Sequence, residues 1–331
     1  MAFLGVPFTA GGTETARVNV AEFSDNSPVA LPVATVGGRK DGPTLYVQAA
    51  VHGDETTGVE IARRFLAEID PEQLSGRVVV VPASNLPAFL TRTRMWDLEE
   101  RGSNDVWQLY PGWDGGLLSE RLSHVLFHEF IDAADVTIDL HCALDGCDII
   151  PFVYVLPDDG DHEAYDKSLA IAQAYGTPYL YRVDQTKTDR SRLPLSIRVM
   201  DRGLMPDMGS SIIVTAEMGE SRRVSHDFVP IGVKGLHRTL QVLDMMPGDP
   251  EPLPEPRGFS EVAPVHTNRG GGLRLRKGLG DDVEEGEVIG EVVDVFGTTI
   301  EELRAPMTGF VFRVMKLGNA GTGAEAFWIA S

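Results

Sequence analysis

Up to about residue 246, continuously apolar runs alternate with segments that have the spacing of an amphipathic helix. The run TLYVQAAV (44–51) predicts a buried strand, and GVEIARRFLAEI (58–69) predicts a helix that gathers its apolar side chains on one face. Further strands are predicted at 76–83, 135–141 and 210–219, and further helices at 117–133, 163–176 and 231–246. Because continuous apolar strands need cover on both sides, we expect an α/β fold with helices on both faces of a sheet.

A segment dense in proline and acidic residues, MMPGDPEPLPEPRG (245–258), interrupts this alternation. Such a composition is typical of a stiff, extended linker. After it, short β-prone runs are separated by Gly, Asp and Asn, which predicts a small all-β barrel or sandwich. We therefore expect a catalytic domain at 1–246, a linker at 247–258 and a small β-domain at 259–331 that caps the cleft or forms an interface.

The overall charge and the cysteine content exclude several classes of partner. The 331 residues carry a formal net charge of −20, which argues against nucleic acid or an anionic membrane as the main partner. The two cysteines, Cys142 and Cys147, are too few for a disulfide framework. With no basic and apolar leader and no apolar run of about 20 residues, we expect a cytoplasmic protein.

Two histidines and a glutamate lie at the ends of predicted strands. His52 and Glu55 directly follow the strand at 44–51, and His141 ends the strand at 135–141. Binding sites of open α/β sheets gather at the carboxyl ends of strands. Two histidines and one carboxylate, with a fourth position left open, form a pattern typical of catalytic zinc. The simpler alternative is that Glu55 favours a helix N-terminus and that His141 is an ordinary core or surface histidine.

Glu217 lies near the end of a third apolar run, IIVTAEMGES. A carboxylate beside a zinc site can act as a general base, because zinc lowers the pKa of a water to about 7. The alternative is a strand-end glutamate that forms a surface ion pair. The coincidence of four such residues at strand ends favours the catalytic interpretation.

These motifs resemble those of a known family. AAVHGDETTGVE, IDLHCALDG and TAEMGE are similar to segments of the succinylglutamate desuccinylase/aspartoacylase family, a branch of the zinc carboxypeptidase-like fold, and APMTGFV resembles its C-terminal region. The resemblance covers nearly the whole chain and implies a mixed sheet. It also implies that His52, Glu55 and His141 bind one Zn²⁺ per chain, and that Glu217 is the general base and later the general acid.

Two further segments extend the resemblance. SNLPAFLTRTR resembles the family's N-P…R stretch, which implies that Arg94 polarises the scissile carbonyl and that Asn85 contacts the substrate. A fixed cation at that point would stabilise the oxyanion of a tetrahedral intermediate. The alternative for Arg94 is a solvated loop arginine. Asp105 matches a family aspartate that supports a zinc-binding histidine.

The sequence departs from the family at the residues that grip a substrate carboxylate. The family pattern D-L-N-R-x-F-P-G corresponds to DVWQLYPG here, so Trp107 and Gln108 stand in place of Asn and Arg. A glutamine does not replace a bidentate guanidinium. Three interpretations remain open: another arginine enters the pocket, Trp107 and Gln108 contact a substrate without that carboxylate, or Trp107 is merely packed. Candidate arginines are Arg101, Arg190, Arg192 and Arg198.

The sequence thus predicts a zinc-dependent amidohydrolase that removes an N-acyl group from an amino acid or a related small amine. The residue types predict the zinc chemistry, whereas the preference for acyl amides follows only from the family resemblance. A peptidase or esterase with the same zinc site and a catalytically silent binding protein are the alternatives. The expected partner is a small N-acylated substrate, with no nucleic acid or membrane, and a homo-oligomer is one use for the predicted β-domain.

Overall fold

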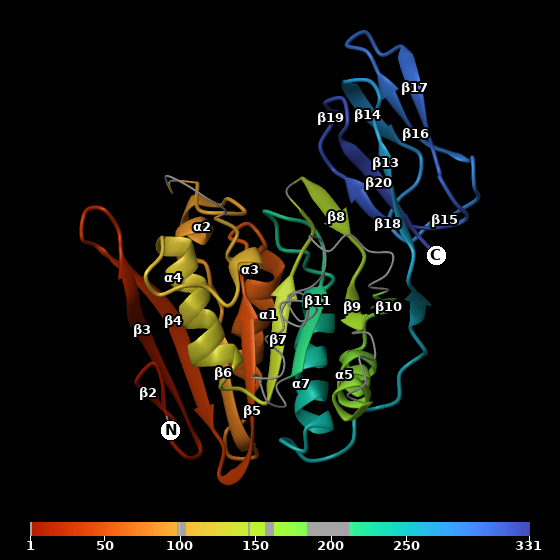
Figure 1. The fold of residues 1–331 in the computed structure, drawn as a ribbon. Helices are drawn as coiled ribbons and strands as arrows, with labels where there is room; N and C mark the ends of the chain where they lie inside the picture. The colour runs from red at the N-terminus through yellow and green to blue at the C-terminus, as the bar shows by residue number, and fades with distance from the viewer. Residues whose placement is uncertain (1, 98, 100–103, 145, 156–161, 184–211) are drawn as a thin grey trace.

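A large mixed sheet forms the centre of the computed structural model (Figure 1). The structure describes residues 2–97, 99, 104–144, 146–155, 162–183 and 212–331. The nine strands lie in the order β12 (Arg257–Phe259), β10 (Tyr179–Arg182), β9 (Phe152–Val155), β11 (Ile212–Glu217), β7 (Val136–His141), β5 (Lys40–Ala49), β6 (Ser75–Val81), β4 (Pro28–Gly37) and β3 (Gly12–Glu22). A short hairpin precedes them, formed by β1 (Ala2–Phe3) and β2 (Val6–Pro7).

The central four strands, β11, β7, β5 and β6, all run parallel. The sheet becomes mixed outside them, because β4 pairs antiparallel with β6, β3 with β4, and β9 with β11. Parallel strands have their carboxyl ends at one edge of the sheet, and in open α/β sheets that edge is where sites form. The mixed α/β sheet predicted from the sequence is confirmed.

Helices cover both faces of this sheet. One face carries α1 (Thr56–Glu68), α5 (His162–Tyr175) and α7 (Val229–Val242). The other carries α3 (Val106–Leu109), α4 (Leu118–Val125) and the π-helical turn η1 (Leu126–Ile131). The short helix α2 (Leu86–Thr91) follows β6. The single helix predicted at 117–133 is therefore divided into an α-helix and a π-helical turn.

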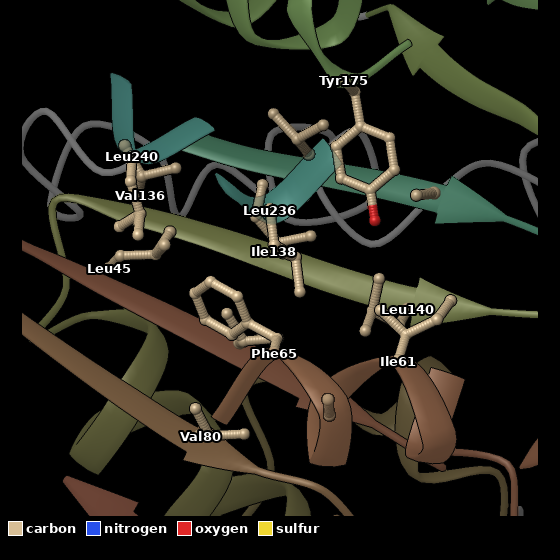
Figure 2. Packing of buried hydrophobic residues seen from close by; sticks show 14 of the residues in the cluster. Leu45, Ile61, Phe65, Val80, Val136, Ile138, Leu140, Tyr175, Leu236 and Leu240 are labelled. Carbon is tan, nitrogen blue, oxygen red and sulfur yellow. The ribbon is translucent and has the colours of Figure 1, made fainter. Parts of the chain in front are cut away.

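The buried core explains why the strands are continuously apolar. Ile61 and Phe65 of α1 lie against Ile138 and Leu140 of β7, and Leu236 of α7 completes the same layer (Figure 2). On the opposite face a second apolar cluster includes helix and strand residues, with the rings of Tyr46 and Phe130 stacked at 5.1 Å. Both faces of the central strands are dry, so both faces require apolar side chains.

The C-terminal part forms two antiparallel sheets, here called the C-terminal sheets. One contains β13 (Val262–His266), β20 (Glu325–Ala330), β18 (Gly309–Met315) and β15 (Asp282–Val283). The other contains β17 (Thr299–Arg304), β16 (Val288–Val293), β14 (Gly271–Leu275) and β19 (Asn319–Ala320). The small all-β part expected from the sequence is confirmed.

Two strands connect the C-terminal sheets with the rest of the molecule. Residues 247–256 contain no helix or strand, but β12, just after them, pairs with β10 at the edge of the large sheet. In the other direction, β8 (Cys147–Ile149) leaves the α/β part and pairs antiparallel with β18 (Figure 1). Among the described residues, no helix is both long and apolar enough to cross a membrane.

Candidate active site

Three of the predicted site residues lie at the carboxyl ends of three neighbouring parallel strands. His52 follows the end of β5, His141 ends β7 and Glu217 ends β11. In the register of the sheet, Glu217 is paired directly with His141. The strand order β11-β7-β5 therefore brings together residues that are far apart in the sequence.

Glu55 occupies the N-cap position of α1 but does not cap it with its side chain. Its Oε1 lies 2.8 Å from His52 Nδ1, and its Oε2 lies 3.0 Å from His141 Nδ1. The amide nitrogen of Cys142 donates to the same Oε2 at 2.9 Å. The carboxylate thus faces two imidazoles, which favours the metal-site interpretation over the helix-terminus one.

A second carboxylate lies behind each imidazole. His52 Nε2 is 3.1 Å from Asp105 Oδ1, and His141 Nε2 is 2.9 Å from Asp139 Oδ2. Imidazoles that bind metals are usually held in this way through the nitrogen that does not face the metal. Asp105 was predicted, whereas Asp139 was missed. Its signal in the sequence is the spacing of two before His141, which places both side chains on one face of β7.

The residues present fit a metal ion. One ligand atom from each of His52, Glu55 and His141 lies within 4.8 Å of the others, and all three side chains are buried. Nitrogen and carboxylate oxygen donors in this combination suit Zn²⁺ and leave one position open for water or substrate. A buried carboxylate between two oriented imidazoles is thus a ready-made cation site.

Neighbouring charges outweigh burial in setting the pKa values of Glu55 and His141. Burial alone would raise the pKa of Glu55, but His52 and His141 hold that pKa well below its usual range. Burial would likewise lower the pKa of His141, but Asp139 and Glu55 raise it well above its ordinary value. The negative groups that would retain a proton on His141 also favour a metal cation in its place.

Glu217 faces this ligand set from β11. Its Oε2 is buried and has no hydrogen-bond partner among the described residues. Burial raises the pKa of Glu217 to about 8, with Glu55 adding to the rise and His141 and Arg94 opposing it. A carboxyl group with a pKa near the working pH can both accept and return a proton.

Arg94 contacts the ligand set directly. Its Nη1 atom donates to Glu55 Oε1 at 2.7 Å, and its side chain is only 23% exposed. The backbone of the same residue accepts a hydrogen bond from Gly53, which fixes the loop between β5 and α1. The alternative of a solvated loop arginine is therefore not what the structure shows.

A cavity of about 680 Å³ opens over these residues. All predicted site residues except Asn85 line it: His52, Glu55, Arg94, Asp105, Trp107, Gln108, His141 and Glu217. The indole of Trp107 lies 6.1 Å from the His52 ring and 6.0 Å from the His141 ring, between ring centroids. Four arginines considered for this pocket, Arg101, Arg190, Arg192 and Arg198, lie outside the described residues.

Asn85 has a local role that accounts for its amide. Its Oδ1 accepts from the backbone nitrogen of Ala88 at 3.3 Å and caps α2, while its Nδ2 donates to the Val51 carbonyl at 3.1 Å. It is buried and does not line the cavity. Its substrate contact stays a prediction, and the geometry gives it a structural task beside His52.

The C-terminal sheets form one wall of the cavity. The sequence did not indicate which of their residues would lie there. Val262, Pro264, Phe312, Arg313, Glu325 and Trp328 all line it, together with Tyr154 and Tyr181 of the large sheet. No local motif marks these residues, because they reach the site through contacts between distant segments, such as the pairing of β8 with β18. The expectation that this part caps the cleft agrees with their position.

Residues 41–243 match the family model of the succinylglutamate desuccinylase/aspartoacylase catalytic domain. The chain belongs to this family. It is accordingly an enzyme of the deacylase type, an amidohydrolase with a buried His–Glu–His group that can hold a metal ion. The matched range includes both histidines, Glu55, Arg94 and Glu217.

Related proteins share this architecture over nearly their full lengths. The N-alpha-acetyl-L-2,4-diaminobutyric acid deacetylase of Halomonas elongata is 27% identical over 315 residues, covering 92% of this chain and 87% of that protein. The product-bound ectoine utilization protein of Ruegeria pomeroyi has a TM-score of 0.85 at 23% identity, covering 98% and 97% of the two chains. A succinylglutamate desuccinylase/aspartoacylase from Rhodobacter sphaeroides has a TM-score of 0.82 at 24% identity, covering 97% and 95%. These structures share the fold.

Proposed function

We propose that this family member is a zinc-dependent deacylase that hydrolyses the amide bond of an N-acylated amino acid or a related small amine. The main support for the proposal is that Glu217 and the buried His52–Glu55–His141 group line the same cavity. A proton-accepting carboxyl beside a cation site is what hydrolysis of an unreactive amide requires.

Each residue of the site would have one role in the hydrolysis. His52, Glu55 and His141 would hold the zinc ion, which when bound lowers the pKa of a water and polarises a carbonyl oxygen. Glu217 takes the proton of the attacking water and returns it to the leaving nitrogen. Arg94 donates toward the oxygen of the scissile carbonyl, where negative charge develops. Asp105 and Asp139 keep the two imidazoles oriented.

The charge of the cavity indicates the kind of substrate. Among its described lining residues are five carboxyl groups and two guanidinium groups; these are Glu55, Asp105, Glu217, Glu261, Glu325, Arg94 and Arg313. Even with a zinc ion bound, such a lining tolerates an ammonium group in addition to a carboxylate. The Halomonas elongata relative is named for a substrate with both groups, an N-acetylated diamino acid. We therefore infer an N-acetylated diamino acid as the first substrate to test.

The test is a deacylation assay on the purified protein supplied with zinc. N-acetylated amino acids and diamino acids, dipeptides and simple esters are incubated with the wild type and with Glu217→Gln, and the released acid and amine are quantified. Release from the N-acetyl compounds by the wild type alone supports the proposal. Turnover of only peptides or only esters would reassign the activity, and no turnover of any compound would favour a silent binding protein. A cytoplasmic location and a homo-oligomer stay predictions.

A further inference from the structure

Arg313 is a buried arginine in the wall that the C-terminal sheets contribute to the active-site cavity. It lies on β18, lines the same cavity as His52 and Glu217, and is only 4% exposed. Burial of a guanidinium is costly unless charged and hydrogen-bonding partners surround it. The partners that Arg313 has, and the one it lacks, therefore indicate what it does.

Two side chains of β20 fix the plane of this guanidinium. Its Nη2 atom donates to Glu325 Oε2 at 2.6 Å, and its Cζ atom lies 4.6 Å from the ring centre of Trp328. The indole nitrogen of Trp328 donates to the same Glu325 oxygen at 2.9 Å. The three residues form one unit, in which the aromatic face and the carboxylate hold the arginine in a single orientation.

One donor of this guanidinium is left over. Arg313 Nε is buried and has no hydrogen-bond partner among the described residues. A buried, unsatisfied donor is unfavourable in a stable fold and requires an explanation, of which a functional role is one. An oxygen acceptor from a bound molecule would satisfy it.

The other guanidinium on the described lining lies at the predicted metal ligands and has the scissile carbonyl as its proposed substrate contact. Arg94 donates to Glu55, a predicted metal ligand, at 2.7 Å. At the position where the family pattern has an arginine for a substrate carboxylate, this chain has Gln108. Among the described residues of the cavity, Arg313 is thus the guanidinium not committed to the predicted metal ligands.

We propose that Arg313 binds the carboxylate of the substrate, so that the C-terminal sheets supply a specificity-determining residue. This inference rests on the proposed function and narrows the substrate to N-acyl compounds that carry a carboxylate. The guanidinium fork, desolvated and pre-oriented by Glu325 and Trp328, is suited to a planar carboxylate. Because Glu325 neutralises part of its charge, the site also accommodates a nearby ammonium group on the same substrate.

The fold fixes this wall relative to the catalytic residues. β8 follows His141 in the sequence after a short loop, and its Ile149 is paired with Arg313 of β18. The amide of Ile150 donates to the Phe312 carbonyl at 3.2 Å, and the amide of Gly219, two residues after Glu217, donates to the Ile149 carbonyl at 3.3 Å. The position of Arg313 is therefore tied through hydrogen bonds to the segments that follow β7 and β11.

The experiment compares two substrates that differ only in the proposed contact: an N-acetyl amino acid that the wild type hydrolyses, and its carboxamide. In Arg313→Gln, we expect kcat/KM for the carboxylate substrate to fall about 10–100-fold, mostly through KM, as for a lost hydrogen bond to a charged group. The carboxamide should change less than about twofold by the same argument, since it makes no charged contact. A purely structural arginine would affect both substrates alike, and that result, or no effect on either, would overturn the proposal.

Two controls keep the result interpretable. Arg276→Gln removes an arginine that pairs with Glu291 in the C-terminal sheets and does not line the cavity, so both substrates should keep their wild-type kinetics. If Arg313→Gln fails to fold, Arg313→Met retains an unbranched stem against Trp328 and should show the same selective loss. Wild-type turnover of both substrates without preference for the carboxylate overturns this inference alone. Turnover of neither overturns the proposed function, and the inference falls with it.

Discussion

Glu217 has a buried carboxylate oxygen without a partner among the described residues, at the end of a strand that runs beside the one carrying His141. Replacing it by glutamine keeps the shape and removes the ability to take a proton. We expect Glu217→Gln to retain bound metal while kcat falls about 10²–10⁴-fold, the usual contribution of a general base. Steady-state kinetics with elemental analysis of the same sample would check this. Full activity in this variant would eliminate the proton-transfer role.

A substitution of Asp139 tests whether the carboxylates behind the two imidazoles contribute to metal binding. Asp139 lies 2.9 Å from His141 Nε2 and is fully buried. Loss of such an orienting carboxylate typically weakens metal affinity about 10–100-fold, and we expect this for Asp139→Asn in a zinc titration against a chelating dye. Asp132→Asn, at an exposed position just before the same strand, is the matched control. Equal affinities in the two variants would contradict the role of Asp139.

Substitutions at Trp107 and Gln108 test the absence of the family's Asn–Arg pair, which binds a substrate carboxylate. Both residues line the cavity, so the positions that hold the family's Asn–Arg pair do face the site. The double variant Trp107→Asn with Gln108→Arg should raise kcat/KM for substrates with an additional carboxylate in the acyl group, because it adds a guanidinium fork. Competition between an N-succinyl and an N-acetyl substrate measures this directly. An unchanged ratio would mean that the correspondence of these positions with the family pattern is wrong.

The loop between β5 and α1 shows, at the scale of elements, why a glycine lies between two ligands. A Cβ atom on Gly53 would lie 2.1 Å from the backbone of Ala88 in α2, so the loop that carries His52 and Glu55 is pressed against that helix. We expect Gly53→Ala to lower both stability, by about 1–3 kcal/mol, and zinc affinity. Denaturant unfolding and a zinc titration would check this. Gly321→Ala, where a Cβ meets nothing within 4 Å, is the control; identical behaviour of the two variants would refute the packing argument.

The elements that position the site are those most visible in the sequence. The strands β5, β7 and β11 are buried on both faces, so they are continuous apolar runs, and the ligands follow at their ends. Strands β3 and β4 were not predicted. β4 contains prolines at Pro28 and Pro32, which argue against a strand inside a sheet, and β3 lies at the edge with partly exposed side chains.

The residues that the C-terminal sheets contribute to the cavity could not be predicted from the sequence, for a different reason. Arg313 and Glu325 lie on neighbouring strands of a small sheet and join through their side chains, and nothing in their local pattern indicates an active site. They reach the cavity because β8, a three-residue strand, pairs with β18. Such pairing between distant segments depends on the whole fold, whereas the spacing of His52 and Glu55 is a local property.

At the scale of the whole molecule, a metal that binds only the folded chain should stabilise it. At a free zinc concentration 100 times the dissociation constant, linkage contributes about 2.7 kcal/mol to the free energy of unfolding. For a chain of this size the melting temperature should then fall by about 4 °C when a chelator removes the metal, and recover when zinc is added. His141→Ala should show no such chelator-dependent change. Equal chelator-induced shifts in both proteins would locate the stabilising metal elsewhere.

The central claim is that His52, Glu55 and His141 hold a zinc ion, and the metal content of the purified wild-type protein tests it most directly. Elemental mass spectrometry on protein freed of loosely bound ions should find about one zinc per chain, in keeping with a site of two histidines and one carboxylate. A protein that contains no metal, even after incubation with zinc and removal of the excess, would contradict the account.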